Sequence, residues 1–214
     1  LRNTTDPIGR IKVQWSERLM SSNKLYLDGC SFTYGFGLEE NEKLAYLFQK
    51  EGGYEVVNRS RPGKSNSAIA LDIHRYSQDC NCIVVGWTFS DRFYLESRGN
   101  KMDFLPTRYN LATSDEDIGA EIEDVYTKIH KQLYAIYDNQ FYDDVSDLIV
   151  TSTYANLIRQ GKTVIFFSWE NRKTDVDIFY PIVSPEGRLS DGHLNKKSMK
   201  KLYEDITWFN EKTK

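Results

Sequence analysis

The sequence predicts an α/β domain built on a mostly parallel sheet. Short β-prone runs recur along the chain, and segments with apolar residues at helical spacing separate them. Two of these runs, at 82–87 and 163–168, are apolar throughout, which is typical of parallel strands covered on both faces. These observations predict a sheet with helices packed against it.

The elements alternate in the order strand, helix, strand, helix. We predict strands at 24–28, 54–58, 82–87 and 163–168, with a short fifth strand at 178–183. Helices are expected at 39–51, 68–76 and 196–212, and in one or two segments of 118–160. Residues 98–117 lack clear periodicity, so we interpret them as an excursion or flap.

A single domain accounts for most of the 214 residues. We assign it to 24–214, with a helical and loop insert at about 98–160. Residues 1–23 form an N-terminal extension, in which a short helix is expected around 13–20.

Composition excludes several classes of protein. Lys and Arg number 28 against 31 Asp and Glu, so the net charge of −3 offers no basic footprint for nucleic acid. No apolar run reaches the length of a membrane span, so we expect no membrane partner. Three cysteines, Cys30, Cys80 and Cys82, do not make a disulfide framework, which favours a reducing, cytoplasmic compartment.

Polar residues and glycines follow the predicted strands. Parallel sheets bind ligands at the carboxyl ends of their strands. Ser31 follows the first strand in a glycine-flanked turn, and Gly63 lies in the turn-rich segment 59–66 after the second strand. Thr88 and Arg92 come after the third strand. We therefore expect these residues to meet at one edge of the sheet.

A histidine and an aspartate lie together near the end of the chain, in Asp191-Gly192-His193. A serine becomes an effective nucleophile when an imidazole takes its proton, and a carboxylate can orient that imidazole. The oxyanion that develops needs fixed N–H donors, which glycine-rich turns supply. This combination of residues predicts acyl transfer.

The same residues resemble the blocks of the SGNH (GDSL-type) hydrolase superfamily, over about 24–206. Gly29-Cys30-Ser31-Phe32-Thr33 is similar to the first block, which implies that Ser31 is the nucleophile. The resemblance further implies that Gly63 is an oxyanion donor, that His193 is the base and that no metal or cofactor is needed. It also implies a three-layer α/β/α sandwich of flavodoxin-like type.

The chain departs from the family pattern at three places. Cys30 replaces the aspartate beside the serine, and the third block lacks its asparagine, so Asn66 or Thr88 is the expected substitute donor. The family aspartate lies three residues before the histidine, where this chain has Ser190. Asp191 is our choice for the carboxylate. The alternatives are Asp175, Asp177 or a Ser–His pair without a carboxylate.

The resulting hypothesis is a serine esterase or O-deacylase that acts on a small or carbohydrate-like ester. Arg92 either binds an acidic group of that substrate or pairs with Asp91 or Glu96. An acyltransferase with the same triad is one alternative, and a non-catalytic binding or structural module on a degenerate SGNH fold is another. The variant blocks resemble a subgroup of phage and bacterial genomes, so a virion-associated location is an alternative to the cytoplasm.

Aromatic residues are abundant, with 14 tyrosines among them. One group lies near the candidate site and a second group lies in the insert. The insert therefore forms a lid over Ser31, a homo-oligomer contact through its tyrosines, or neither. The tyrosines of the two groups are Tyr34, Tyr94 and Tyr109, and Tyr126, Tyr134, Tyr137, Tyr142 and Tyr154.

Overall fold

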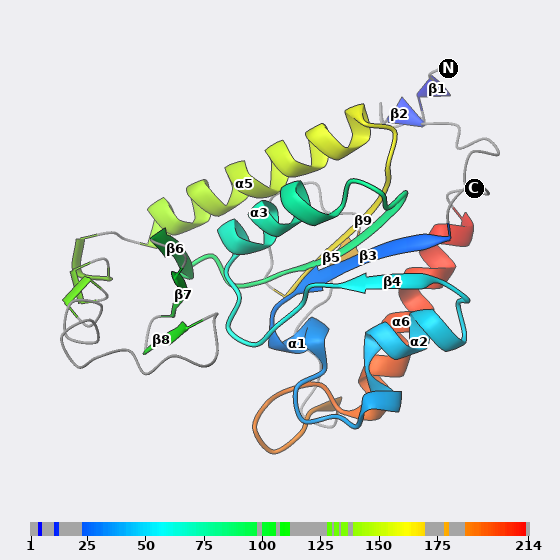
Figure 1. Ribbon diagram of the computed structural model, residues 1–214, viewed down its shortest axis with the longest axis horizontal. Helices are drawn as coiled ribbons and strands as arrows, with labels where there is room; N and C mark the ends of the chain where they lie inside the picture. The colour runs from blue at the N-terminus through cyan, green and yellow to red at the C-terminus, as the bar shows by residue number, and fades with distance from the viewer. Residues whose placement is uncertain are drawn as a thin grey trace.

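The computed structural model places a central sheet between two layers of helices (Figure 1). It describes residues 4–5, 11–12, 23–97, 100–105, 108–111, 128–129, 131–132, 134–136, 139–169, 178–179 and 187–212. The helix expected around 13–20 lies outside these residues. Within the extension, β1 (Thr4–Thr5) pairs with β2 (Ile11–Lys12) in an antiparallel ribbon.

The central sheet has five parallel strands. They are β3 (Lys24–Gly29), β4 (Glu55–Asn58), β5 (Cys82–Trp87), β9 (Thr163–Ser168) and β10 (Ile178–Phe179). Their order across the sheet is β4-β3-β5-β9-β10. This is the flavodoxin-like order, in which the direction of strand addition reverses between the first and third strands of the sheet. The predicted α/β class is therefore confirmed.

Helices cover both faces of the sheet (Figure 1). α2 (Leu44–Lys50) and α6 (Lys196–Lys212) lie on one face, and α3 (Asn66–Tyr76) and α5 (Asn139–Arg159) lie on the other. Successive side chains of a strand point to opposite faces. Leu25 and Leu27 therefore pack toward α2 and α6, whereas Tyr26 between them packs toward α3 and α5. The three-layer architecture is confirmed.

The helix predicted at 39–51 is shorter than expected. Residues Glu40–Glu42 form a 3-10 turn, closed by a reciprocal capping box between Glu39 and Glu42. Lys43 is then extended, with ψ of 150°, and α2 begins at Leu44. The buried residues Leu44, Leu47 and Phe48 explain the helical spacing in the sequence, because only this part packs on the sheet.

The excursion predicted at 98–117 contains regular structure that we did not expect. The strands β6 (Phe93–Ser97), β7 (Asn100–Leu105) and β8 (Arg108–Leu111) form an antiparallel sheet. Each strand is short and mixes charged with apolar residues, so alternation is hard to recognise in the sequence. In Figure 1 this second sheet lies beside the beginning of α5.

Tyrosines of the insert pack inward where the structure describes them. Tyr142 is buried, and its ring lies 5.8 Å from that of Tyr134. The Tyr154 ring packs on Phe166 of β9, with centroids 5.5 Å apart. These contacts explain the tyrosine spacing by packing on the domain. A homo-oligomer formed through the insert stays a prediction.

Candidate active site

The candidate nucleophile lies at the point where the strand order reverses. β3 and β5 are neighbours there, with Gly29 opposite Gly86, and ligands of such sheets bind outside these carboxyl ends. Cys30 is the N-cap of α1 (Ser31–Tyr34), so Ser31 is the first helical residue. The predicted position of Ser31 at a strand end is therefore what the structure shows.

Tight packing holds this turn on the sheet. A Cβ atom added to Gly86 would lie 2.2 Å from Thr33 Oγ1 and 2.6 Å from the Phe167 ring. Real Cβ atoms do not approach other atoms so closely, so only glycine fits at position 86 while Thr33 is in place. Ser31 is buried and keeps 7% of its surface exposed. The Ser31 turn therefore packs closely on the sheet through Thr33.

Asp191 and His193 are brought together by a tight turn. The His193 N–H donates to Asp191 Oδ1 at 3.1 Å, and His193 Nδ1 lies 3.1 Å from Asp191 Oδ2. The ring is not aligned for a good hydrogen bond at this second contact. Gly192 has φ of 87°, which favours glycine and turns the chain back on itself. A carboxylate two residues before the histidine can therefore reach the imidazole.

The same contact sets the charge of Asp191. The hydrogen bond from the His193 backbone N–H lowers the pKa of the Asp191 carboxyl below its usual range. A carboxylate that accepts N–H donors is stabilised in its charged form. Asp191 thus remains an anion beside the imidazole.

Aromatic rings join the His193 loop to the Ser31 turn. The His193 ring lies 5.1 Å from the Phe32 ring and 5.0 Å from the Phe36 ring, measured between centroids. Among the described residues, no hydrogen bond joins Ser31 Oγ to His193. Catalytic hydrogen bonds are often long or poorly aligned without substrate and tighten when the substrate binds. The alternatives Asp175 and Asp177 lie outside the described residues.

The segment that carries Gly63 is tied to the Ser31 turn. The Arg61 N–H donates to the Gly29 carbonyl at 3.1 Å, which continues the pairing of β4 with β3. Within the described part of the chain, the backbone N–H groups of Ser31 and Gly63 donate no hydrogen bond. Among the described residues, both groups thus remain available as donors, and stabilising an oxyanion requires N–H donors that are not already bonded.

A buried ion pair lies beneath this arrangement. Lys64 Nζ contacts both carboxylate oxygens of Asp28, at 2.6 and 2.7 Å, and lies 2.6 Å from Asp72 Oδ2. The Tyr26 hydroxyl also donates to Asp28 Oδ2 at 2.7 Å. Burial raises the pKa of the Asp28 carboxyl, while the Lys64 ammonium opposes that rise. This pair links the Gly63 segment directly to the end of β3.

Sequence reasoning missed Lys64 and Asp28. The signal was present, because Asp28 ends an otherwise apolar run and a buried charge requires a partner. Lys64 is 36 residues away along the chain, so the sequence does not identify it as that partner.

Asn66 is occupied by structural hydrogen bonds. Its amide nitrogen donates to the Thr88 carbonyl at 3.0 Å and to Ser146 Oγ at 2.7 Å, and its oxygen accepts the Thr88 N–H at 2.8 Å. A side-chain amide has two hydrogens, and both are used here. In this arrangement Asn66 has no hydrogen left for an oxyanion, and it instead holds the Thr88 backbone in place.

Arg92 lies next to the Gly63 segment. Its Nη1 is 3.5 Å from the Lys64 carbonyl oxygen, and its guanidinium lies 5.0 Å from the centroid of the Phe89 ring. Arg92 also lowers the pKa of Asp91, although burial raises that pKa more. The half-buried guanidinium is thus near the candidate site and electrostatically coupled to Asp91.

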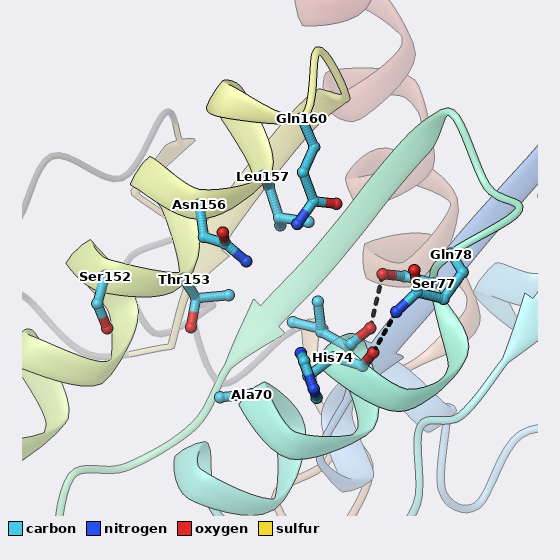
Figure 2. A pocket seen from close by; sticks show the side chains of 10 residues that line it. Ala70, His74, Ser77, Gln78, Ser152, Thr153, Asn156, Leu157 and Gln160 are labelled. Carbon is cyan, nitrogen blue, oxygen red and sulfur yellow. Dashed lines mark hydrogen bonds between the residues drawn. The ribbon is translucent and has the colours of Figure 1, made fainter.

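A pocket between α3 and α5 lies apart from these residues. Figure 2 shows its lining, which includes His74, Ser77, Gln78 and Asn156, around a volume of about 200 Å³. Ser77 Oγ and Gln78 Nε2 are already bonded to helix carbonyls. None of the described lining residues is a carboxylate or one of the predicted site residues. The chemistry of the strand ends therefore identifies the better candidate site.

The described residues provide neither a metal site nor a membrane span. No group of three or more His, Cys, Asp or Glu side chains there could hold a metal ion. None of the helices described is long and apolar enough to cross a membrane. All three cysteines are buried, and none of them forms a disulfide.

The fold and the strand-end site define a three-layer α/β protein of flavodoxin-like strand order. No protein-family model matches the sequence, and no curated protein sequence matches it. Among solved structures, TesA is 13% identical with a TM-score of 0.53, over 89% of this chain and 99% of that chain. The psychrotrophic esterase EstA from Pseudoalteromonas sp., inhibited by monoethylphosphonate, is 10% identical with a TM-score of 0.51, over 89% and 98%. At these identities the likeness establishes the fold.

Proposed function

We propose that this chain is a serine ester hydrolase of SGNH type, an esterase or O-deacylase. The observation that carries the proposal is the Asp191–His193 pair, whose loop packs through Phe32 against the Ser31 turn. The fold of an esterase, EstA, supports it. Small or carbohydrate-like esters are the proposed substrates, with Arg92 beside the site for an acidic group.

In the proposed reaction, Ser31 Oγ attacks the ester carbonyl carbon while His193 takes the Ser31 proton. Asp191 stabilises the imidazolium, and the N–H groups of Ser31 and Gly63 hold the oxyanion. Collapse of the tetrahedral intermediate breaks the bond to the alcohol, which leaves with the proton from His193. Water then attacks the acyl-serine and gives a proton to His193. Collapse of the second tetrahedral intermediate breaks the bond between the acyl carbon and Ser31 Oγ, which takes the proton back from His193 as the acid is released.

The test is hydrolysis of a short-chain nitrophenyl ester by the wild-type protein and by Ser31→Ala. We expect the variant to lose about 10⁴- to 10⁶-fold in kcat, because the nucleophile is removed. Ser152→Ala is the matched control, since Ser152 is an exposed serine on α5 that bonds only its own helix. Equal turnover by Ser31→Ala and wild type would refute the proposal.

Two further measurements separate the alternatives. A fluorophosphonate probe should label Ser31, whereas a folded protein that is neither labelled nor active is the result expected of a non-catalytic module. Adding an acceptor alcohol should leave the acid as the main product. A transesterified product formed in its place indicates an acyltransferase with the same triad.

A further inference from the structure

Asp103 connects the antiparallel sheet of β6, β7 and β8, here called the inserted sheet, to the loop that carries Gly63. It lies on β7, and its side chain is fully buried, with 0% of its surface exposed. Asp103 Oδ1 accepts the Ser65 N–H at 2.9 Å, and Oδ2 forms an ion pair with the Arg61 guanidinium. A single carboxylate thus binds two residues of one short loop.

These two contacts lie on either side of Gly63. Arg61 is two residues before it and Ser65 two residues after it, where Ser65 caps the start of α3. On the opposite side of the loop, Lys64 is held by Asp28. The loop is therefore fixed both from the central sheet and from the inserted sheet.

Burial makes the contacts of Asp103 interdependent. A buried carboxylate is costly unless it is paired and hydrogen-bonded. Here the compensation comes from Arg61 and Ser65, so β7 can bury Asp103 only while the loop keeps this conformation. The inserted sheet and the Gly63 loop consequently stabilise each other.

We propose that Asp103 is a positioning residue, through which the inserted sheet holds the Gly63 N–H in place for the oxyanion. This inference rests on the proposed ester hydrolysis. In this role the sheet of β6, β7 and β8 completes the candidate site, because it supports one of the two proposed oxyanion donors. The substrate itself does not touch Asp103 in this role.

The test compares Asp103→Ala with Asp103→Asn. Alanine removes both contacts, and we expect kcat for the nitrophenyl ester to fall by about 100-fold, because a small displacement of a catalytic group has that effect. Asparagine keeps an acceptor for the Ser65 N–H, so we expect a smaller loss. Asp205→Asn on α6 is the matched control, since its carboxylate makes an exposed ion pair with Lys201.

A double-mutant cycle tests the pairing with Arg61. Arg61→Gln and Asp103→Asn should each lower kcat, and the double variant should be no worse than the more damaged single variant. All rates are measured well below each variant's melting temperature. Loss of thermal stability with unchanged kcat, or additive losses in the cycle, would overturn the positioning role.

A readout independent of activity is amide hydrogen exchange at Ser65. Asp103→Ala should speed exchange at Ser65 and in 61–65, whereas Asp205→Asn should not. If the wild type neither hydrolyses esters nor reacts with the probe, the proposed function fails, and this exchange result still decides whether Asp103 holds the loop. Unchanged exchange in Asp103→Ala refutes the inference in either case.

Discussion

Lys64 and Asp28 form an ion pair of 2.6 Å in which both side chains are completely buried. The pair joins the loop that carries Gly63 to the strand that precedes Ser31. Burying two charges is costly, and their mutual attraction offsets the cost only when the geometry and the additional hydrogen bonds are good. Here Asp72, Tyr26 and the Arg59 carbonyl supply further contacts.

We expect Lys64→Met to lower the free energy of unfolding by about 3–5 kcal/mol at neutral pH, because it leaves Asp28 as an uncompensated buried charge. Burial raises the pKa of Asp28, and removing Lys64 raises it further. For a carboxyl with a raised folded-state pKa, stability falls as pH rises from the unfolded pKa through the folded one. The destabilisation should therefore shrink as pH is lowered toward about 4.

Urea unfolding at a series of pH values measures this effect. The double variant Lys64→Met/Asp28→Asn is the control, because it removes the charge together with its partner and should recover part of the loss at neutral pH. A destabilisation that is equal at every pH would contradict the buried-charge explanation.

The Asp191–His193 pair leads to a prediction about rate. Asp191→Asn should lower kcat by about 10²- to 10⁴-fold, because the amide cannot stabilise the imidazolium. The asparagine oxygen can still accept the His193 N–H, so the variant should stay folded at the assay temperature. Kinetics and a thermal melt are compared with Asp205→Asn. An unchanged kcat would mean that Asp191 does not orient His193. Asp175, Asp177 or a Ser–His pair without a carboxylate would then be the alternative.

The lowered pKa of Asp191 also leads to a prediction about the stability of the protein at low pH. Its folded-state pKa is lowered, so its contribution to stability is present above the usual carboxyl pKa and is lost as pH falls through the lowered value. The difference in melting temperature between wild type and Asp191→Asn should therefore be larger at pH 7 than at pH 2. A melting-temperature difference that is larger at pH 2 than at pH 7 would contradict a lowered pKa of Asp191.

Gly86 should not tolerate a side chain. Gly86→Ala places a Cβ against Thr33 and Phe167, and overpacking of this kind costs about 1–3 kcal/mol. Because Thr33 belongs to the Ser31 turn, labelling of Ser31 by a fluorophosphonate should also slow. Gly161→Ala is the control, since φ of 71° makes it destabilising but its Cβ meets open space far from the turn. Equal labelling rates in the two variants would argue against the predicted displacement.

Asn66 should act through the Thr88 backbone. Asn66→Ala leaves the Thr88 N–H and carbonyl without this partner, and each unsatisfied buried group costs about 1–3 kcal/mol. We expect stability and Ser31 labelling to fall together, whereas Asn156→Ala, at an exposed position of α5, should change neither. A lower kcat with unchanged stability would instead favour Asn66 as an oxyanion donor.

Much of the fold could be predicted from local patterns. The runs at 82–87 and 163–168 are apolar at every position, and strands β5 and β9 occupy those residues. The three-stranded antiparallel sheet was missed, because its strands are short and lack a clear alternation. The helix before β4 was predicted too long, since the capping box at Glu39 and Glu42 closes a separate 3-10 turn.

By itself, the sequence determined the class of the fold, the position of Ser31 directly after a strand and the position of Gly63 in a turn-rich segment after another strand. These could be predicted because apolar periodicity and glycine-rich turns are local properties. Only the tertiary structure decided which residues meet. Lys64 reaches Asp28, Asp103 reaches Arg61, and the amide of Asn66 is taken by Thr88 and Ser146. Buried charges and amides need partners, and here these partners lie far away in the sequence. The packing of the whole chain brings them together, and no local pattern encodes that packing.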